Sequence, residues 1–596
     1  MHSPAAAAVE ADYDARLARW RAERDARERT QRMVGSVRVA LAAAAIVLVI
    51  ALRFDAAPWL GLIAVAFVAA VVWHARVISA RDRARRAVAW YEQGVRRIRH
   101  EWIGHGDQGD RFRPDDHLYA ADLDLFGHGS LFQLLSTART RGGQETLASW
   151  LLEPASPDVV RARQAAVREL ASRLPLREAM AVEGEGFHVE AVALRNWAIA
   201  PPQLPSRHIA WPLAILSAVN ITLLVWFLAT DRLGLLSLAV MTLQGAVVLW
   251  LYPRASKVIR AVETPARDLA VVASLLRVLE RESFDAPALQ ALTAAIGGHD
   301  RPASAEIAHL ERLVSRLAWR RDMIFVIPAA LMLWGTHCAL AIDGWRRRTG
   351  RRVPAWLDAV GAFEAYAALA TFAAEHPAYV FPAIEVAPSA RLAATSLAHP
   401  LLPATAVAND VAIGGDAPAL LVVSGSNMSG KSTFLRAIGV NTVLAHAGAP
   451  VRAAHFTASP LHVCASIQVV DSLVDGESRF FAEIRRLKAV VDHAKARPGK
   501  ALFLLDEILS GTNSHDRAHG ADGLMQGLLR EGAVGLVTTH DLALSRIAET
   551  LAPRAANVHF ADAFDEGGLQ FDYRLRPGPV RTSNALALMR SIGLDV

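Results

Sequence analysis

The sequence is poor in cysteine and in lysine, and its amino-terminal end lacks a recognisable leader. Only two cysteines, Cys338 and Cys464, occur among 596 residues, and neither lies in a metal-ligand spacing. This argues against a disulfide framework and against a zinc site, and it fits a protein that folds in a reducing compartment. The first 34 residues are strongly charged, so no cleavable signal peptide is visible there. A chain of this length should form several domains.

One of the five lysines lies in a glycine-rich segment typical of phosphate binding. The segment follows the apolar run 419–423 and precedes a helix-like run that starts at Phe434. In a strand, loop and helix order, backbone N–H groups and the helix start attract phosphate, the lysine reaches the terminal phosphates, and the following serine ligates Mg²⁺. The alternative is a chance glycine-rich turn. The predicted nucleotide-binding residues are Gly425, Ser426, Asn427, Met428, Ser429, Gly430, Lys431, Ser432 and Thr433, with Ser432 also a metal ligand.

Carboxylates further along the chain complete the predicted site. Residues 501–505 form an unbroken apolar run, typical of a buried parallel strand, that ends in Asp506 and Glu507. The carboxyl ends of such strands face the crevice where α/β sheets bind ligands. We therefore predict that Asp506 holds Mg²⁺ and that Glu507 activates the attacking water. The alternative for this pair is a solvated strand end.

A second apolar run, residues 534–537, leads to His540. This position predicts a sensor of the γ-phosphate. An isolated histidine is by itself weak evidence, and a purely structural role is the alternative.

Charge is missing from four long runs that raise the mean hydropathy to +0.24 and the hydrophobic fraction to 53%. Residues 39–52 and 56–73 form one pair, and residues 209–230 and 233–252 form a second. Each later run has about 20 residues, enough to cross roughly 30 Å of hydrocarbon. The short first run is extended if Arg38 snorkels to the lipid headgroups. The sequence predicts two hairpins of membrane helices; the alternative is a pair of buried core hairpins.

Flanking arginines predict the orientation of the first hairpin. Seven arginines precede residue 35, and five follow the second run between residues 76 and 86. Both flanks should be cytoplasmic because positive charge is enriched on that side of membranes. A fifth uncharged run, 323–342, contains Pro328 and His337. If it crossed the membrane, the phosphate loop would lie outside the cell, so we expect a buried helix of the soluble part.

The residues from His399 to Leu594 resemble the ATPase domain of the MutS proteins of DNA mismatch repair, which is of the ABC type. The resemblance rests on the phosphate loop and on the segment 505–516, Leu-Asp-Glu-Ile-Leu-Ser-Gly-Thr-Asn-Ser-His-Asp. Shorter matches are 448–451, 557–560 and 583–586. The resemblance implies an ATP-hydrolysing domain that works as a homodimer.

Residues 471–483 are similar to the signature segment of that family. By this resemblance, Ser478 reaches the nucleotide of the partner subunit, which would couple ATP occupancy to the geometry of the dimer. Taken without the resemblance, a serine of this kind is more typical of a turn or a helix cap.

Upstream, residues 130–164 and 356–382 resemble the start and the return of the MutS core and lever; generic amphipathic helices are the alternative. Mismatch-reading members of the family carry an N-terminal domain with a Phe-x-Glu wedge. This chain departs from the family there, because it has a charged tail and an apolar hairpin in place of that domain. A second apolar hairpin replaces the lever extension and clamp. The resemblance therefore does not carry mismatch recognition over to this chain, although arginine and lysine contacts to DNA phosphates stay open.

We expect a multidomain protein in which α-helical membrane hairpins and a helical lever/core domain precede a C-terminal α/β P-loop ATPase domain of the ABC type. The expected segments are a charged tail (1–34), hairpin 1 (35–75), a helical linker with the start of the core and lever (76–207), hairpin 2 (208–253), the helical return (254–390) and the ATPase domain (391–596).

The expected function is that of a MutS-like ATPase that uses ATP and Mg²⁺ in a homodimer. Its ATPase domain should face the cytoplasm at the inner membrane, and ATP-gated DNA binding is the expected output. A transporter-like membrane ATPase is the main rival, but no intact Leu-Ser-Gly-Gly-Gln segment lies between Lys431 and Asp506. A structural membrane ATPase without DNA binding is the third hypothesis.

Overall fold

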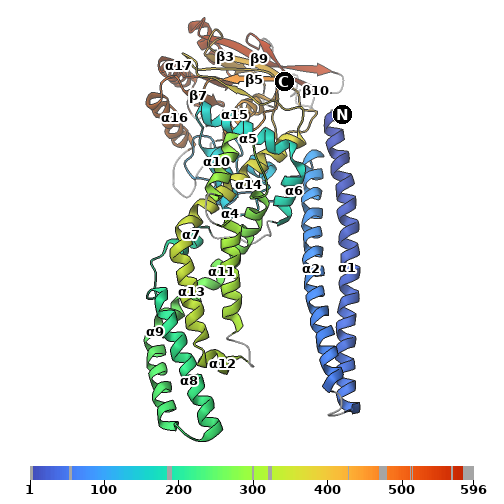
Figure 1. Cartoon of the computed structure of the whole chain (residues 1–596). Coiled ribbons are helices and arrows are strands. Elements are labelled where there is room, and N and C mark those ends of the chain that lie inside the picture. The colour runs from blue at the N-terminus through green and yellow to red at the C-terminus, as the bar shows by residue number, and fades with distance from the viewer. Residues whose placement is uncertain are drawn as a thin grey trace. The chain divides into compact units, whose positions relative to one another are not determined.

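The chain combines a helical region with a C-terminal α/β domain, as the sequence predicts (Figure 1). The computed structural model describes residues 4–580, except for 53–56, 184–190, 298–300, 320–324, Asn427, 469–478, 510–511, Asn513 and 566–567. Two compact units are present. The first contains Met1–Thr137, Thr146–Arg177 and Tyr366–Val596, and the second contains Ala138–Glu145 and Glu178–Ala365.

The first unit begins with two long helices, α1 (Pro4–Leu52) and α2 (Ala57–Ile98), which pack along each other. The charged tail is therefore part of α1, because it has a partner surface on α2. The ring of Tyr13 is buried against Tyr91, with ring centroids 5.3 Å apart. Arg99 Nε donates to Glu10 Oε1 over 2.6 Å and adds an ion pair between the helices.

A six-stranded sheet forms the centre of the α/β domain, in the order β10-β9-β4-β8-β7-β6. Its five strands from β9 to β6 are parallel, and β10 pairs antiparallel with β9. The runs predicted to be strands form β4, β7 and β8. The strand bounds are β4 (Leu420–Ser424), β6 (His462–Ser466), β7 (Ala501–Leu505), β8 (Val534–Thr539), β9 (Ala555–Asp565) and β10 (Gly568–Pro577).

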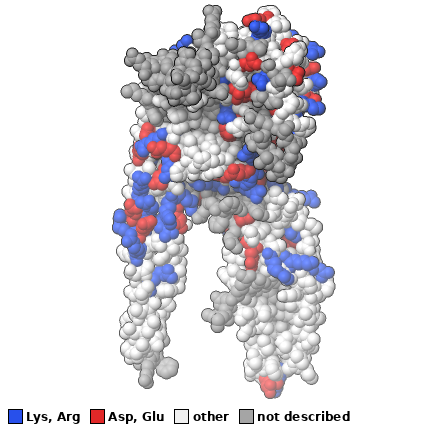
Figure 2. All heavy atoms as spheres, turned by 180° about the vertical axis from the view of Figure 1, so that it is seen from behind, with Lys and Arg blue, Asp and Glu red and all other residues white. Residues whose placement is uncertain are grey.

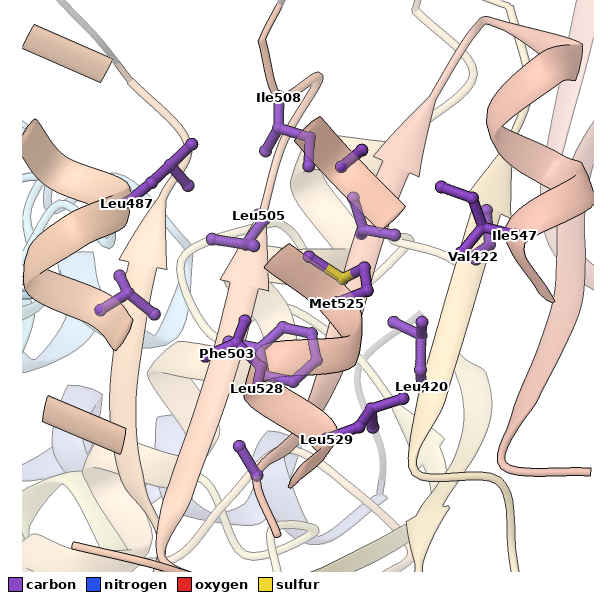
Figure 3. Close-up of a cluster of buried hydrophobic side chains, with 14 of the residues drawn as sticks. Leu420, Val422, Leu487, Phe503, Leu505, Ile508, Met525, Leu528, Leu529 and Ile547 are labelled. Atoms are coloured by element: carbon purple, nitrogen blue, oxygen red, sulfur yellow. The ribbon is translucent and has the colours of Figure 1, made fainter. Parts of the chain in front are cut away.

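Helices bury these apolar strands. Figure 3 shows Leu420 and Phe503 of the sheet packed with Met525, Leu528 and Ile547 from the covering helices. The helices of the domain are α15 (Lys431–Ala447), α16 (Arg479–Ala496), α17 (Ser514–Arg530) and α18 (Leu542–Thr550). Burial of such continuous apolar runs is the main stabilising contribution of a parallel sheet.

A second, mixed sheet of four strands completes the domain, in the order β1-β5-β2-β3. Its strands are β1 (Ala383–Ile384), β2 (Arg391–Leu397), β3 (Asn409–Gly414) and β5 (His455–Ala458). The helical segments that precede the domain in the chain are α3 (Leu131–Leu135), α4 (Arg141–Leu152), α5 (Pro157–Ser172), α6 (Leu174–Glu183) and α14 (Val353–Glu375).

The second unit is helical and contains the second apolar hairpin. Helix α8 (Ala210–Thr230) is joined to α9 (Gly234–Leu279) by a tight turn in which Asp231 and Leu233 have positive φ angles. Helix α9 continues well beyond the predicted apolar run. The other helices of the unit are α7 (Ala191–Ile199), α10 (Pro287–Ile296), α11 (Ala303–Ala318), α12 (Val326–Leu331) and α13 (Trp334–Thr349).

Among the described residues, five helical stretches have the length and apolar composition needed to cross a membrane. Four of them, Pro4–Ala51, Trp59–Ile98, Ala210–Thr230 and Gly234–Ala266, leave at least 83% of their most apolar window outside the protein core. Figure 2 shows long uncharged surfaces on these helices. The fifth stretch, Trp334–Glu375, is mostly buried.

The run 323–342 does not form the single helix that its sequence suggests. Its described part is divided between α12 and α13, because Leu333 has a φ of 50° and ends the helical path. Residues 323 and 324 lie outside the described part. Cys338 and Leu340 in α13 are buried as expected, whereas Ile327 in α12 is 70% exposed.

Candidate nucleotide-binding site

The predicted phosphate loop connects β4 to α15. Gly430 has a φ of 100°, a conformation that favours glycine, and it directly precedes the helix. A Cβ atom at Gly425 would lie 2.7 Å from Ser429 Oγ, so a side chain would fill the loop. Asn427 lies outside the described residues. The amino end of α15 therefore points its free N–H groups toward a narrow loop, the arrangement that binds phosphate.

Lys431 is the first residue of α15, and it is only 5% exposed. Its Nζ atom donates to the carbonyl oxygens of Gly425 and Ser426, each over 2.9 Å. Burial lowers the pKa of Lys431, and the negative charges of Glu507 and Asp506 oppose that shift. A largely dehydrated cation at this place interacts strongly with an anion because water screens it little.

The loop also contains polar atoms that the protein does not satisfy. Within the described part of the chain, the buried hydroxyls of Ser426 and Ser429 have no hydrogen-bond partner. Buried polar groups without partners are uncommon, and they suit a site that receives a polar ligand. The loop therefore fits phosphate oxygens in space, in charge and in hydrogen-bonding capacity.

The predicted metal ligands are in direct contact. Ser432 Oγ donates to Asp506 Oδ2 over 2.6 Å, and Thr538 Oγ1 donates to Asp506 Oδ1. A hydroxyl and a carboxylate are oxygen ligands of the kind that Mg²⁺ prefers. Mg²⁺ is commonly bound by one or two protein ligands together with substrate phosphates and water, so Ser432 and Asp506 could hold the ion.

Glu507 and His540 lie close together just beyond the ends of the neighbouring strands β7 and β8. Glu507 has a φ of 45°, and its N–H donates to Thr538 Oγ1 over 3.0 Å. Its Oε1 atom lies 3.4 Å from His540 Nδ1 and 3.7 Å from Lys431 Nζ. The sheet order explains the meeting, because β8 lies between β4 and β7 and all three strands end at the same edge.

A cavity of about 720 Å³ extends from the loop to residues that the sequence did not single out as ligands. Its polar lining includes Lys431, Thr433, Asp506 and Glu507. The same cavity is lined by apolar and aromatic side chains, which include His399, Leu402, Val407, Phe434, Phe560 and Tyr573. A cavity lined by a cation and by apolar side chains suits a nucleotide, which has charged phosphates and an apolar base.

Tyr573 reaches this cavity from the edge strand β10. A Cβ atom at Gly430 would lie 3.1 Å from Tyr573 Cδ1, so the ring borders the phosphate loop. The pairing of β9 with β10 shifts register between Phe571 and Leu575, and Tyr573 has a φ of 53°. Such irregularities redirect side chains near sites. The sequence carries no local signal for this placement.

The buried Asp122 forms hydrogen bonds with residues on both sides of the signature-like segment 471–483. Asp122 Oδ1 accepts hydrogen bonds from the N–H groups of Ile467 and Gln468 over 2.7 and 2.9 Å, and its Oδ2 accepts from Arg486 Nη2 over 2.6 Å. Asp122 is 3% exposed. Its contacts flank residues 469–478, which lie outside the described residues and include Ser478.

Only the end of the signature-like segment is described. Glu483 in α16 is buried, and its carboxylate accepts a hydrogen bond from the N–H of Leu509, just beyond Glu507. The late motif 583–586 lies outside the described residues, and residues 557–560 belong to β9. The role of Ser478 therefore stays a prediction.

Comparison with known proteins supports the resemblance for the C-terminal part. Residues 421–595 match the family model of MutS domain V. The chain is 35% identical to the DNA mismatch repair protein MutS of Natronomonas pharaonis over 178 residues, which cover 29% of this chain and 20% of that protein. It is 33% identical to the DNA mismatch repair protein MutS of Thermus thermophilus over 251 residues, covering 41% and 28%.

A third relative, DNA mismatch repair protein MutS 2 of Haloarcula marismortui, is 32% identical over 205 residues, covering 34% of this chain and 21% of that protein. The chain thus matches less than a third of the length of these relatives. The likeness to MutS domain V, an ATPase domain, is confirmed, and the matched residues contain the phosphate loop, Asp506, Glu507 and His540.

Proposed function

We propose that this protein is a membrane-anchored, MutS-like ATPase that binds and hydrolyses MgATP as a homodimer and gates DNA binding with it. The contact of Ser432 with Asp506 beside the buried Lys431 carries the proposal. It supports the proposal because the Lys431 cation, the Ser432 hydroxyl and the Asp506 carboxylate lie together at one edge of the sheet, within the residues that match MutS domain V.

In this proposal, each residue has a role that follows from its position in the site. The loop and Lys431 bind the β- and γ-phosphates, and apolar side chains that line the cavity, Val407 and Phe434 among them, receive the adenine ring. Ser432 and Asp506 hold Mg²⁺, which when bound neutralises charge on the phosphate oxygens. Glu507 accepts a proton from the attacking water, and His540 orients Glu507 and responds to the γ-phosphate.

A second protomer completes the site in this proposal. Ser478 belongs to the segment between the hydrogen-bond partners of Asp122. It would reach the nucleotide of the partner, as the resemblance implies. Closure of the dimer would then depend on ATP in both sites. The names of the relatives support DNA as the ligand that this closure controls, and mismatch reading itself is not part of the proposal.

The exposed apolar helices support the membrane anchor. The hairpins α1–α2 and α8–α9 expose many large apolar side chains, and Leu235 in α9 is 87% exposed. Arg254 lies over the ring of Trp250 at 5.3 Å, a pair typical of the lipid headgroup level. With the arginine-rich flanks in the cytoplasm, the phosphate loop faces the cellular ATP pool.

Turnover of the full-length protein in detergent tests the enzymatic part. We expect Mg²⁺-dependent ATP hydrolysis that falls about 10²–10⁴-fold in Glu507→Gln, because that change removes the general base, while ATP stays bound and the dimer becomes more stable. Glu531→Gln, in the loop after α17, serves as a matched control. Unchanged hydrolysis in Glu507→Gln would refute the assignment of the base.

The DNA part is tested with matched, mismatched and branched duplexes in the same assay and by binding at several salt concentrations. Stimulated turnover and salt-dependent binding support DNA as the ligand. If none of the DNAs changes the rate of hydrolysis and no salt-dependent binding is found, DNA is not the ligand. The transporter-like and the structural membrane ATPase would then be the hypotheses that stay. Fractionation of cells tests the anchor, since a protein found only in the soluble fraction contradicts both hairpins.

A further inference from the structure

Hairpin α8–α9 contains a buried polar link at half its depth. Asn220 Nδ2 in α8 donates to Gln244 Oε1 in α9 over 2.9 Å, and both side chains are buried. Gln244 lies ten residues after Gly234 and ten before Arg254, which is about 15 Å from each in a helix. If the hairpin spans a hydrocarbon layer of roughly 30 Å, this link lies near the middle of the layer.

The same glutamine holds the end of the short helix α12. Gln244 Nε2 donates to the carbonyl oxygen of Leu331, the last residue of α12, over 2.9 Å. Helix α12 also contacts α8 and lies beside the middle of the hairpin (Figure 1). A carbonyl at the end of a helix needs a partner where no water is present, and Gln244 supplies one.

The side of α12 that faces away from the protein is apolar. Ile327 is 70% exposed, Val326 is 49% exposed, and Met332 just beyond the helix is 43% exposed. At the depth of Gln244, such side chains would contact lipid chains rather than water. In a water-soluble part of the protein they would form an apolar patch without a partner.

The residues on either side of α12, Trp319 and Trp334, lie next to each other. The rings of Trp319 and Trp334 stack with centroids 6.0 Å apart and planes 6° apart, and Trp334 Nε1 donates to the carbonyl oxygen of Arg316 over 2.8 Å. A segment that crossed a bilayer would have its ends about 30 Å apart. The stacked tryptophans therefore indicate that the helices before and after α12 have their ends on the same side of the layer.

We propose that α12 is a re-entrant membrane element, with Ile327 in the lipid hydrocarbon and Gln244 as its attachment to the hairpin. This inference rests on the proposed membrane anchor. It replaces the expectation that the run 323–342 is a buried helix of the soluble part. It also keeps four crossings in total, so the chain returns to the side of the membrane that holds the phosphate loop.

Spin labelling tests the depth of α12. In full-length protein with Cys338→Ala and Cys464→Ala, single cysteines are placed at Ile327, at Leu228 of α8 and at Val386, which are all strongly exposed. The labelled proteins are reconstituted in phosphatidylcholine and phosphatidylglycerol vesicles. Collision rates with oxygen, which collects in lipid, and with a nickel chelate, which stays in water, are then measured.

We expect Ile327→Cys to resemble Leu228→Cys, with high oxygen and low nickel accessibility, and to differ from Val386→Cys. High nickel accessibility at Ile327 with a lipid-exposed Leu228 would overturn the re-entrant element and leave the anchor intact. High nickel accessibility at both positions would overturn the anchor as well.

A second variant tests the attachment. Gln244→Leu removes the donor to Leu331, so the label at Ile327 should become more mobile in the vesicles. Thr242→Val is the matched control, because its hydroxyl only bonds within α9, to Leu238. Equal label mobility in both variants would show that Gln244 does not hold α12.

Discussion

Ser432 and Asp506 are joined by a hydrogen bond of 2.6 Å, although 73 residues separate them in the sequence. Ser432 lies in the first turn of α15, and Asp506 follows β7 directly. The intervening strand β8 supports the pair, since Thr538 donates to the second oxygen of Asp506. The ends of three strands thus lie together at one candidate metal position.

Lys431→Met should weaken ATP binding by about 10- to 100-fold, because it removes a charge-assisted hydrogen bond worth about 1.5–3 kcal/mol. Binding of a fluorescent ATP analogue measures the effect. Lys488→Met is the matched control, since the Lys488 side chain is 72% exposed and pairs with Asp492 at the surface. Equal affinity of the two variants would contradict the assignment of the loop.

Asp122→Asn should lower turnover several-fold and leave the affinity for ATP within about threefold of the original. The Asp122 side chain holds Ile467, Gln468 and Arg486 beside the signature-like segment. Its contact with Arg436 of α15 is made by the backbone carbonyl, which the substitution keeps. Loss of a charged acceptor for Arg486 costs about 1.5–3 kcal/mol locally. Turnover and ATP binding are measured side by side.

The control for Asp122→Asn is Asp124→Asn, because the Asp124 side chain is 45% exposed and lies 3.5 Å from Arg436. It should change turnover little. If Asp122→Asn instead weakened ATP binding as much as turnover, Asp122 would support the fold of the whole domain rather than the position of this one segment.

Glu375→Gln should destabilise the first unit by about 3 kcal/mol, since it leaves a buried cation without its partner charge. Arg97 donates to both carboxylate oxygens of Glu375 over 2.7 and 2.6 Å, and the side chain of Glu375 is fully buried. This pair ties α2 to the end of α14. Thermal unfolding in detergent, followed by circular dichroism, measures the loss.

The matched control is Glu10→Gln, which breaks the more exposed pair of Glu10 with Arg99 between α1 and α2. Exposed ion pairs contribute about 0–1 kcal/mol. Similar unfolding temperatures for Glu375→Gln and Glu10→Gln would mean that burial does not strengthen the Arg97 pair.

Stability should decrease as the pH falls below about 6.5, the ordinary pKa of histidine, in part because of His399. Burial lowers the pKa of His399 to about 4, and the positive charges of Arg436 and Arg452 add to this effect. Between these two values the unfolded chain binds a proton that the folded chain does not, so protonation favours unfolding. The stabilising contribution of neutral His399 is present in full above about pH 6.5. It is lost as the pH falls toward about 4.

The expected loss from His399 is at most roughly 3 kcal/mol. Unfolding temperatures between pH 7.5 and 4.5 should fall less steeply in His399→Asn than in the original protein. His515→Asn, a change at an exposed position, should leave the slope unchanged. An identical slope in all three proteins would remove His399 from the account of acid sensitivity.

Local sequence patterns were sufficient for the central part of the site. The continuous apolar runs at 419–423 and 501–505 required buried strands, and the glycine-rich loop required a turn before a helix. The structure places Lys431, Asp506, Glu507 and His540 together because parallel strands end at one edge of a sheet. The roles of these residues stay predictions until turnover is measured.

Long-range contacts decided what local patterns could not express. Nothing near Tyr573 in the sequence indicates that a shifted strand pairing brings its ring to Gly430. The sequence around Asp122 does not indicate its role, because its partners Ile467 and Gln468 lie far along the chain.

The sequence by itself determined that the chain has uncharged runs long enough for membrane helices and a phosphate loop between a strand and a helix. These properties depend on neighbours along the chain, through hydrophobicity and backbone conformation. Only the tertiary structure decided that the run 323–342 breaks at Leu333 and that Gln244 holds the end of α12. The physical reason is that a hydrogen bond between residues 87 positions apart depends on how helices pack.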